Sequence, residues 1–410
     1  MISVVHLQTH LPSSGNAAYR LHNALCQAGV NSSMLSMSSD ISKSDRIDYL
    51  GRKSQVTSFL NNKLQAYLLR DTLDQYGLFS FPILGNNVSD MEQVESADII
   101  YLHWVMGGFL NLANIEQIAA LNKPVIVFMH DMWAITGGCH YSFMCENYLY
   151  GCQDCQMFPA KKFFDLPVIE FKAKLKLYQK YSNLFFVTPS AWLYNLTKKS
   201  LLTKNKPVYH IPNIINVSKF KKIDRQTARA ILSLDPDDKI IAFGAASPTS
   251  PYKGWEYLRQ ALELFAKSYT SSKVSVLIFG SEHDAKLAEA IPFKTHFVGR
   301  LRDDYSTALV YNAANVFVAP SMADNLPTTV MESLCCGTPV VGFAIGGIPD
   351  MVQHKENGYL AAYKDAEDLA AGIRFCLDSG VTGKLLPCFD TEKILEQHFA
   401  LYEEMLSLKP

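Results

Sequence analysis

Two carboxylates eight residues apart, Asp324 and Glu332, lie in the segment of the chain that is richest in signals for chemistry. Asp324 stands in a polar loop after the short apolar run 316–319, and Pro327 is well placed to begin a helix that carries Glu332. Such a helix directs free backbone N–H groups and the positive end of its dipole at a diphosphate. The spacing therefore predicts that Glu332 accepts both ribose hydroxyls of a nucleotide, while Asp324 reaches a sugar beyond the phosphates.

Small residues around the two carboxylates favour a binding site. Gly346 and Gly347 follow the next apolar run, in a turn where the backbone can approach a ligand closely. Taken alone, the two carboxylates would be a loop residue and a solvated helix residue. The glycines favour the binding interpretation, which also includes Asn325 and Leu326 from the loop.

A lysine in the sequence YKGW, residues 252–255, could supply a cation for the same phosphates. Lys253 directly precedes an expected helix, where an ammonium adds point charge to a site that already favours phosphate. A solvated lysine is the alternative interpretation. Gly244 ends the expected strand before this loop, and Gly299 and Arg300 follow another strand, where Arg300 either flanks a ligand or lies on the surface.

Polar residues also follow expected strands in the first half of the chain. The carboxyl ends of parallel strands meet at one edge of a sheet, so these residues should lie near one another. A histidine at a strand end is more often structural than catalytic, but two on neighbouring strands are less usual. Asp131 could orient His130, and the aromatic rings could either stack on sugars or pack in the core. The residues are Gly15, Asn16, His103, Trp104, His130, Asp131 and Trp133.

The segment 316–352 resembles the signature of retaining glycosyltransferases with the GT-B fold, in the large family of bacterial polysaccharide and lipopolysaccharide synthases (glycosyltransferase family 4 type). That signature has a carboxylate, seven residues and then Glu, followed by Gly-x-Pro-Val-Val and a Gly-Gly-x-x-Glu turn. The chain matches it with Asp324, Glu332, GTPVV (337–341) and GGIPD (346–350). Asp324 stands where the family usually has Glu. The basic residue that usually follows the first strand of the second domain is missing from GAASPTSPYKG, which leaves Lys253 as the phosphate cation.

The resemblance implies two Rossmann-like doubly wound α/β domains that face each other across a cleft. It implies that residues 298–301 flank the nucleotide base, that Lys253 contacts the diphosphate and that His130 contacts the donor sugar near its anomeric carbon. His130, Asp324 and Lys253 are therefore the catalytic candidates. Gly15, Asn16, His103 and Asp131 are expected on the acceptor or cleft side.

Four of the nine cysteines are clustered with the spacing C-x5-C-x6-C-x2-C. Two thiolates on one tight turn, as in the GCxxC at 151–155, can share a tetrahedral zinc ion. A structural zinc is one interpretation, and reduced cysteines in a loop core or redox chemistry are the others. A similar insert occurs in colanic-acid-type members of the resembled family. The four are Cys139, Cys145, Cys152 and Cys155, and catalysis is expected to require no metal or other cofactor.

Residues 161–180 contain six lysines among apolar residues, which suits the anionic surface of a membrane. Pro167 argues against one continuous helix through the segment. An ordinary solvated helix with one packed face is the alternative. A lipid-linked acceptor would give peripheral contact with the inner face of the plasma membrane a function.

Short apolar runs alternate with amphipathic stretches along all 410 residues, which predicts βα units around parallel sheets. In the first half, strands are expected at 2–7, 98–102, 124–130 and 183–188, with a helix at 16–28. A second series begins with the strand 239–244. We place an acceptor-binding domain at 1–213 with the Cys-rich insert near 139–155, a nucleotide-sugar-binding domain at 214–390, and a helix at 391–410 that packs back on the first domain.

The bulk composition limits the classes of function. A net charge of −1 gives no surplus of Lys and Arg for neutralising nucleic-acid phosphates, so no nucleic-acid partner is expected. The first residues lack the pattern of a signal peptide and no apolar run is long enough to span a bilayer, which predicts a cytoplasmic protein.

The predicted function is therefore retaining glycosyl transfer, with a hexose as the expected sugar. A nucleoside-diphosphate sugar is the donor, and a saccharide or lipid-linked saccharide of bacterial surface polysaccharide synthesis is the acceptor. A nucleotide-sugar epimerase or phosphorylase on the same scaffold is an alternative, because a fold does not fix a function. A non-catalytic nucleotide-sugar-binding protein is another.

Overall fold

The computed structural model describes residues 2–11, 17–39, 44, 46–70, 72, 77–158, 165–244, 250, 252–270, 273–301 and 303–408. The chain forms two compact units. Unit 1 comprises Met1–Ile214 and Asp390–Pro410, and unit 2 comprises Ile215–Phe389. These divisions fall one residue from the boundaries placed on the sequence.

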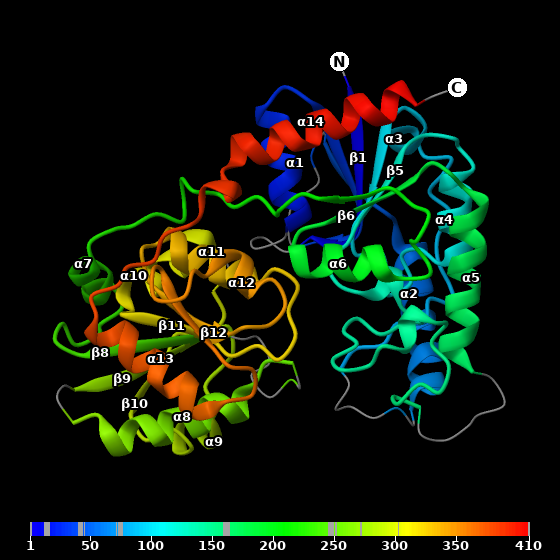
Figure 1. Cartoon of the computed structure of the whole chain (residues 1–410). Coiled ribbons are helices and arrows are strands. Elements are labelled where there is room, and N and C mark those ends of the chain that lie inside the picture. Colours follow the sequence, from blue (N-terminus) through cyan, green and yellow to red (C-terminus); the bar gives the residue numbers. More distant parts are fainter. Residues whose placement is uncertain are drawn as a thin grey trace. The chain divides into compact units, whose positions relative to one another are not determined.

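Unit 1 is built on a seven-stranded sheet with the order β3-β2-β1-β4-β5-β6-β7, and all of these strands pair in parallel (Figure 1). The order places the first strand beside both the second and the fourth, which is the doubly wound Rossmann arrangement. The strands are β1 (Ser3–Leu11), β2 (Asn31–Ser39), β3 (Ile47–Tyr49), β4 (Ile99–Leu102), β5 (Val125–Phe128), β6 (Leu184–Thr188) and β7 (Val208–His210).

Both faces of this sheet are covered, because its strands are apolar on both sides. Val5 and Ile100 face one core with residues of α4 and α5, whereas Val4 and Ile99 face a second core with α1 and α14. Such alternation along buried strands is typical of parallel sheets. The helices of unit 1 are α1 (Ala17–Gln27), α2 (Arg52–Leu69), α3 (Glu92–Glu95), α4 (Leu112–Ala119), α5 (Leu166–Lys180), α6 (Ala191–Lys199) and α14 (Thr391–Ser407).

The C-terminal helix α14 belongs to unit 1. Ile394, Leu401 and Met405 are buried in the same core as α1 and the outer face of β1 and β4. Tyr402 donates or accepts a hydrogen bond of 2.7 Å with the hydroxyl of Tyr101 on β4. The helix therefore completes one face of the sheet, and Figure 1 shows it in red beside α1.

Unit 2 repeats the same plan with a six-stranded parallel sheet of order β10-β9-β8-β11-β12-β13. Counted within the unit, this is the order 3-2-1-4-5-6 of the Rossmann fold. The strands are β8 (Lys239–Gly244), β9 (Val274–Phe279), β10 (Lys294–Phe297), β11 (Val316–Ala319), β12 (Val340–Phe343) and β13 (Gly358–Ala361). The helices are α7 (Arg225–Ile231), α8 (Trp255–Ser268), α9 (Ala285–Glu289), α10 (Asp304–Ala313), α11 (Thr328–Cys335), α12 (Ile348–Met351) and α13 (Ala366–Asp378).

The pattern of apolar residues explains the helices of unit 2 that matter for the site. In α8, Leu258, Ala261, Leu262 and Phe265 recur on one face and are all buried. The helix α11 begins at Thr328, and Pro327 occupies the position before it. Pro327 was predicted as the first helical residue, and the difference of one position reflects its extended backbone (ψ 116°).

Candidate functional site

The two sheets define where ligands of such folds bind. In an open parallel sheet, the loops after the strands diverge where the strand order reverses, and ligands bind there beyond the carboxyl ends. This switch point lies between β1 and β4 in unit 1, and between β8 and β11 in unit 2. The candidate residues can be placed against these two positions.

In unit 2, Lys253 and Asp324 meet at the switch point. Lys253 stands in the loop between β8 and α8, and Asp324 stands in the loop after β11. The Nζ atom of Lys253 lies 3.1 Å from Oδ2 of Asp324, and the hydroxyl of Ser321 donates to the same oxygen over 3.4 Å. The attraction of Asp324 raises the pKa of Lys253, and burial only partly opposes it. The lysine is therefore a cation, and its side chain is 34% exposed, so a ligand can reach it.

Glycines allow three loops to converge at this point. Gly254 has a φ of +64°, and a Cβ there would collide with the carbonyl oxygen of Pro320. Gly346 has a φ of +60°, and a Cβ there would collide with the carbonyl oxygen of Asp324. Residues with side chains adopt such φ values only at a cost. The close backbone approach around the Lys253–Asp324 pair thus depends on glycine at both positions.

The helices after the switch-point strands begin without a capping side chain. Gly254 precedes α8 and Pro327 precedes α11, and neither residue has a side-chain oxygen that could accept a hydrogen bond from the helix. In contrast, α9, α10 and α13 of the same unit begin after an aspartate that accepts from the first backbone N–H groups: Asp284, Asp303 and Asp365. The uncapped N-termini leave donors and positive dipole ends for an anion.

Glu332 is buried, so the interpretation of a solvated helix residue is wrong. Its side chain is 4% exposed, and Oε2 accepts a hydrogen bond of 3.1 Å from the hydroxyl of Tyr311 on α10. Sequence reasoning missed Tyr311, because nothing in the pattern of α10 marks it as a partner of a carboxylate. Asn325 is also buried, and Leu326 belongs to the core of unit 2. The side chain of Leu326 therefore packs inward, and only its backbone is available to a ligand.

The remaining candidates of unit 2 lie at the ends of β8 and β10. Gly244 ends β8, and a Cβ there would collide with the ring of Phe279. Gly299 has a φ of +70°, and its carbonyl oxygen accepts from the N–H of Gly280 over 2.9 Å. Arg300 is exposed, in agreement with the alternative of a surface residue.

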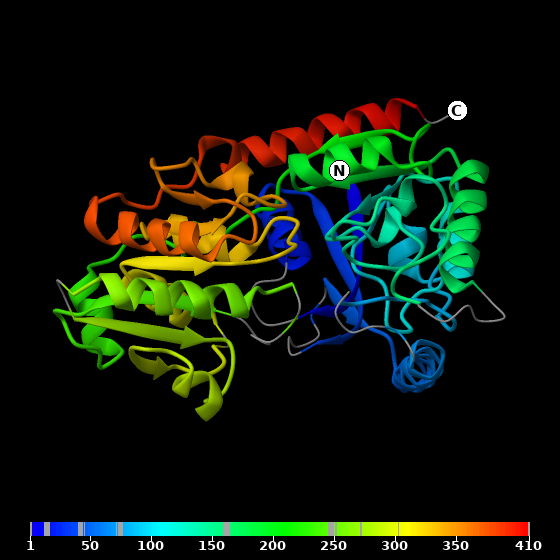
Figure 2. The same cartoon turned by 60° about the horizontal axis from the view of Figure 1, so that its bottom comes forward.

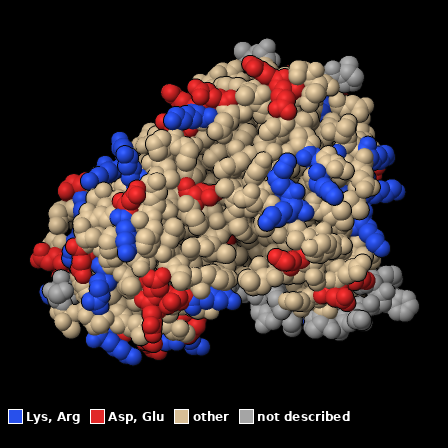
Figure 3. Space-filling model, viewed as in Figure 1, with Lys and Arg blue, Asp and Glu red and all other residues tan. Residues whose placement is uncertain are grey.

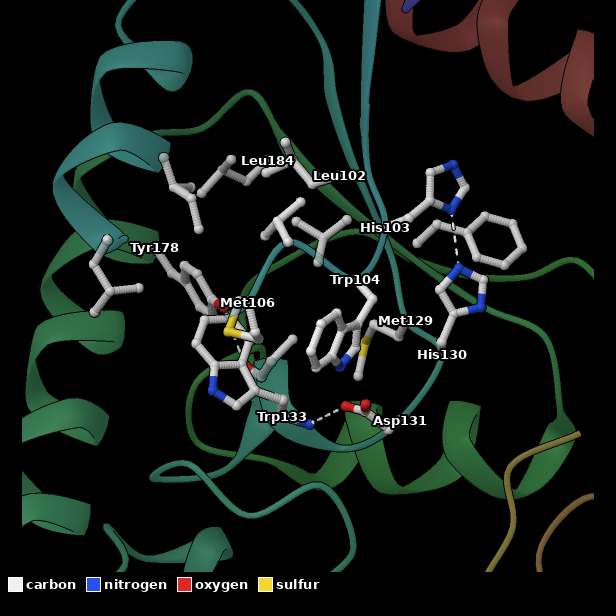
Figure 4. Close-up of a pocket in the computed structure, with 16 residues that line it drawn as sticks. Leu102, His103, Trp104, Met106, Met129, His130, Asp131, Trp133, Tyr178 and Leu184 are labelled. Carbon is white, nitrogen blue, oxygen red and sulfur yellow. Dashed lines mark hydrogen bonds between the residues drawn. The ribbon is translucent and has the colours of Figure 1, made fainter. Parts of the chain in front are cut away.

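In unit 1, His103 and His130 follow β4 and β5 and are hydrogen-bonded to each other. His103 Nδ1 lies 2.9 Å from His130 Nε2 (Figure 4). The Nε2 atom of His103 lies 2.9 Å from Nδ1 of His6 on β1. The three imidazoles therefore form a continuous chain across the switch point. Sequence reasoning missed His6, because it lies inside a strand and not at its end.

Burial keeps this histidine chain neutral. It lowers the pKa of His130 to about 4, although Asp131 acts in the opposite direction. Burial, followed by the neighbouring imidazoles, lowers the pKa of His103 and His6 well below the ordinary value. Each neutral imidazole has one donor and one acceptor nitrogen. The tautomer of His130 is therefore coupled to that of His103.

Asp131 does not orient His130, contrary to the expectation. Its Oδ2 lies 2.6 Å from Nδ1 of His140, and its Oδ1 accepts from the N–H of Trp133. Burial raises the pKa of Asp131, but the attraction and hydrogen bond of His140 outweigh it and leave the pKa lowered. His140 in turn lies 2.8 Å from the hydroxyl of Ser80. Ser80 is 3% exposed, so this Asp–His–Ser series secures the loop that follows β5 and offers no accessible nucleophile.

Figure 4 shows a cavity beside the two histidines, lined mainly by apolar side chains. Its volume of about 40 Å³ holds only a few water molecules and no sugar ring. The ring face of Trp133 is occupied by Lys174, whose Nζ lies 3.4 Å from the ring centroid, and Trp133 Nε1 donates to the carbonyl of Ser80. Trp133 therefore packs in the core, whereas Trp104 is half-buried.

The four clustered cysteines lie in one region of unit 1. Each is without a disulfide. Burial, followed by the charge of Cys152, raises the pKa of the Cys139 thiol, and burial raises that of Cys152 to about 12. Among the residues that the structure describes, no three His, Cys, Asp or Glu side chains are grouped so that they could hold an ion. The zinc stays a prediction. Metal analysis of reduced protein decides it: no zinc together with four titratable thiols, Cys145 and Cys155 included, would reject the site.

Two candidates of the first unit belong to the part of the chain that the structure does not describe. Gly15 and Asn16 lie outside the described residues, as does the stretch 245–249 in which the family's basic residue is missing.

The lysine-rich segment 161–180 has its apolar side packed in unit 1. Pro167 lies in the first turn of α5, where proline is compatible with a helix, so it begins this helix and does not interrupt it. Phe171 and Leu177 are buried in the core. Lys174 is fully buried, and its ammonium donates to the carbonyls of Trp133 and Thr136. Figure 3 shows Lys and Arg side chains at the edge of unit 1 where α5 lies, and Ile169 is the one large apolar side chain of α5 that is exposed. No described helix is long and apolar enough to cross a membrane.

Comparisons with known proteins concern mainly the second unit. Residues 237–379, which lie within unit 2, match the family model described as glycosyl transferases group 1. An uncharacterized glycosyltransferase of Haemophilus influenzae is 28% identical over 133 residues, which are 31% of this chain and 37% of that protein. The N-acetyl-alpha-D-glucosaminyl L-malate synthase of Bacillus anthracis is 19% identical over 83% of this chain and 84% of its own. For the first curated relatives, the match spans only 37% to 41% of their length.

Solved structures resemble the whole chain. Sucrose-phosphate synthase from Thermosynechococcus elongatus has a TM-score of 0.63 at 17% identity, covering 99% of this chain and 100% of the other. The Anabaena protein HepE, solved in complex with UDP and glucose, has a TM-score of 0.62 at 14% identity, covering 98% and 100%. The chain is therefore a two-domain α/β protein with the GT-B fold. The segment of its second unit that matches the glycosyl transferases group 1 model contains the site of Asp324 and Glu332, and the Haemophilus relative is itself described as a glycosyltransferase.

Proposed function

We propose that the protein transfers a sugar from a nucleoside-diphosphate sugar to a saccharide or lipid-linked saccharide acceptor. In this proposal the configuration at the anomeric carbon is retained, and the product belongs to a bacterial surface polysaccharide. The protein acts in the cytoplasm or at the inner face of the plasma membrane.

The observation that carries this proposal is the Lys253–Asp324 pair at the switch point of a group 1 domain. Diphosphates bind at uncapped helix N-termini beyond the carboxyl edge of such sheets. The loop before α8 combines an uncapped N-terminus with the ammonium of Lys253. A bound diphosphate would compete with Asp324 for this ammonium, and the freed carboxylate would accept a hydrogen bond from a sugar hydroxyl.

The transfer itself exchanges one bond at the anomeric carbon for another. The bond from this carbon to the phosphate oxygen breaks, and the acceptor hydroxyl oxygen bonds to the same face of the carbon. The hydroxyl proton passes to the leaving phosphate. Negative charge grows on that phosphate as the bond breaks, and Lys253 with the N-terminus of α8 stabilises it.

The buried carboxylate of Glu332 and the histidine edge of unit 1 have supporting roles in the proposal. Glu332 has one oxygen bonded to Tyr311, and the other is assigned to the ribose hydroxyls. His130 contacts the donor sugar as a neutral imidazole, because its pKa of about 4 excludes a cation at neutral pH. The UDP and glucose in the complex of the Anabaena protein support a nucleotide-sugar donor here.

A panel of donors tests the proposal. The purified protein is incubated with UDP-, GDP- and ADP-sugars, and nucleotide release is measured with and without saccharide acceptors. One donor should be hydrolysed slowly alone and faster with an acceptor, with the α configuration of the donor kept in the product. Conversion of a donor without any release of nucleotide would indicate an epimerase. Binding without turnover for every acceptor would indicate a sensor, and either result would overturn the proposal.

A further inference from the structure

The hydrogen bonds among His6, His103 and His130 can run in either of two directions. In each of the two contacts, the Nδ1 atom of one ring meets the Nε2 atom of the next. A neutral imidazole carries its proton on one nitrogen, so it donates through that nitrogen and accepts through the other. All three rings are therefore protonated at Nδ1, or all three at Nε2. We call these rings the histidine series, and its direction decides whether His130 ends it with an N–H donor or a bare nitrogen.

Stacking holds the rings of the histidine series in place. The ring of Tyr101 is stacked on those of His6 and His103, with centroids 4.6 and 5.7 Å apart, and the rings of His103 and His130 are stacked at 5.2 Å. Figure 2 shows α14, in red, and α1, in dark blue, on this side of the sheet, whose core they share. A ring turned by 180° would replace a bonded nitrogen with a C–H group. Only the positions of the protons are therefore left to be decided.

The buried end of the histidine series favours protons on Nδ1. The Nε2 atom of His6 is fully buried and has no hydrogen-bond partner among the residues that the structure describes. With the proton on Nδ1, this atom is a bare nitrogen, whereas with the proton on Nε2 it is an N–H group buried without an acceptor. Orphaned buried N–H groups are rarer in proteins than under-satisfied acceptors, because the cost of removing the donor from water is not recovered.

A negative charge favours the same direction at the other end. Burial raises the pKa of Asp131, but the attraction and hydrogen bond of His140 outweigh it, so Asp131 is ionised. Asp131 is bonded to His140 and not to His130, yet its charge acts on the His130 ring. When every ring is protonated at Nδ1, the N–H dipoles point from His6 toward His130. The positive end of the histidine series then lies near this carboxylate, which stabilises it.

We propose that all three rings are protonated at Nδ1, so that His130 presents an N–H donor to the bound sugar. His130 is half-buried, and Figure 4 shows its second ring nitrogen, the one not bonded to His103, pointing away from the apolar cavity. An N–H donor selects an oxygen acceptor, such as a hydroxyl group, and rejects a protonated amino group. With Nε2 already bonded, His130 cannot take up the proton of the acceptor hydroxyl. The sugar as ligand rests on the proposed function, whereas the direction of the series does not.

Side-chain ¹⁵N chemical shifts test the direction without any ligand, because protonated and bare imidazole nitrogens have different shifts. The full-length protein, labelled with ¹⁵N-histidine, is measured at neutral pH, and the loss of one ring's signals on its substitution assigns that ring. In His6, His103 and His130, Nδ1 should be protonated and Nε2 bare. A proton on Nε2 of His130, or two tautomers of this ring in exchange, would overturn the proposal.

Two substitutions of nearly equal shape test how the direction is set. His6→Asp places a carboxylate, which only accepts hydrogen bonds, beside Nε2 of His103 and should hold a proton on that atom. The series then reverses, and His130 becomes protonated at Nε2. His6→Leu offers no acceptor at this place, so His130 should keep its proton on Nδ1. The same tautomer of His130 in both folded variants would contradict the proposal. Thermal unfolding shows whether each variant is folded, and the wild-type shifts decide the direction if His6→Asp is not.

Kinetics with the identified donor test the ligand of His130. The kcat/KM of folded His6→Asp should be about tenfold or more below that of folded His6→Leu, because the sugar loses its hydrogen bond from Nδ1. Equal activities of the two variants, with His130 reversed in only one, would show that the sugar does not bond to Nδ1. Absence of turnover by the wild type would contradict the proposed function alone, because the shifts measure the direction of the series independently.

Discussion

The carboxyl edges of the two sheets have the same topology and opposite electrostatics. At the switch point of unit 1, three imidazoles are hydrogen-bonded in series and kept uncharged by burial. At the switch point of unit 2, the ammonium of Lys253 and the carboxylate of Asp324 are paired and partly exposed. A shared strand order therefore fixes where side chains converge, whereas the residues in the loops decide whether the edge suits neutral groups or phosphates.

This difference matches a division of labour in glycosyl transfer. Phosphate binding and departure need fixed positive charge, which the second edge supplies. Sugar hydroxyls are neutral and are recognised by donors and acceptors without a net charge. The neutral edge of unit 1 is suited to that task. A change at the carboxyl edge of either unit tests this division separately.

The largest expected effect is the response of unit 1 to acid. His6, His22, His103 and His398 are buried in unit 1 and His130 is half-buried, and the loss of hydration lowers the pKa of each. The folded state binds fewer protons than the unfolded state, so the stabilisation is complete above pH 6.5 and is lost as the pH falls toward 4. A pKa of about 4, as for His22 and His130, gives a loss on the order of 1 kcal/mol each by pH 5.5. The lowered pKa values of the other three histidines act in the same direction.

Limited proteolysis at pH 7.5, 6.5 and 5.5 with peptide mapping measures this effect. Cleavage inside unit 1 should rise sharply on acidification, before that in unit 2, where His296 is half-buried and its pKa is also lowered by burial. Simultaneous opening of both units, or none by pH 5.5, would contradict the contrast between the edges.

Removal of the Lys253 ammonium should remove the positive charge that the carboxyl edge of unit 2 offers to phosphate. Lys253→Ala should lower kcat/KM about 100-fold or more, because an ammonium at the developing phosphate charge is worth a few kcal/mol. Lys253→Arg should restore only part of the activity, because a planar guanidinium does not replace a compact ammonium in this turn. Steady-state kinetics with the identified donor measure both.

Lys219 provides a closely matched control. It pairs with Asp304 over 3.3 Å and is 37% exposed, against 3.1 Å and 34% for Lys253 with Asp324. It lies outside the loops of the switch point. Lys219→Ala should change kcat/KM about twofold or less, since an ion pair of this exposure contributes little. Equal losses in the two variants would remove Lys253 from phosphate binding.

The sequence predicts the site of unit 2 better than that of unit 1, for a physical reason. Loop glycines, Pro327 and Lys253 have local consequences that can be read from spacing. Hydrogen bonds between strands are not local: His6 and His103 are 97 positions apart, and their pairing depends on the register of β1 and β4. The partner of Asp131 could not be predicted either, because only one short 3-10 helix, Trp133–Ile135, lies in the loop that brings His140 back.

The same distinction holds for the fold. Apolar runs such as 239–244 and 316–319 predict strands at the observed positions. The strand β2 was not predicted, because five of its nine residues are serines, Ser32, Ser33, Ser36, Ser38 and Ser39. Ser32 and Ser36 are fully buried and hydrogen-bonded, which satisfies their hydroxyls inside the core. The helix α2 was missed for a related reason, since its apolar side faces away from the core.

Glu332 tests whether burial and ligand binding can be separated at the second edge. Glu332→Ala should weaken donor binding and activity about 100-fold, because a polar partner of the ligand is lost. It also leaves the buried hydroxyl of Tyr311 without this acceptor, which costs about 1–3 kcal/mol of stability. Tyr311→Phe breaks the same hydrogen bond but leaves the carboxylate in place, so its loss of activity should stay below tenfold. Calorimetric titration with donor and thermal unfolding distinguish the two roles, and equal losses of affinity would make Glu332 structural.

The smallest expected effect concerns the hydrogen bonds between the imidazoles at the carboxyl edge of unit 1. The two ring nitrogens of His103 bridge His6 and His130, so removal of this imidazole leaves His130 Nε2 without its partner. His103→Phe should therefore lower kcat about tenfold with little change in KM, because His130 then populates both tautomers and only one presents the correct nitrogen to the sugar. A merely structural role would not alter the tautomer of His130, and the ¹⁵N chemical shifts of the histidine side chains report this tautomer directly.

The matched control is His22→Phe, which removes another buried imidazole of unit 1. His22 is hydrogen-bonded to Ser32 and not to His6, His103 or His130. Equal effects of the two variants on kcat, or an unchanged ¹⁵N signature of His130 in His103→Phe, would show that His103 only packs and that the neutral edge acts through His130 alone.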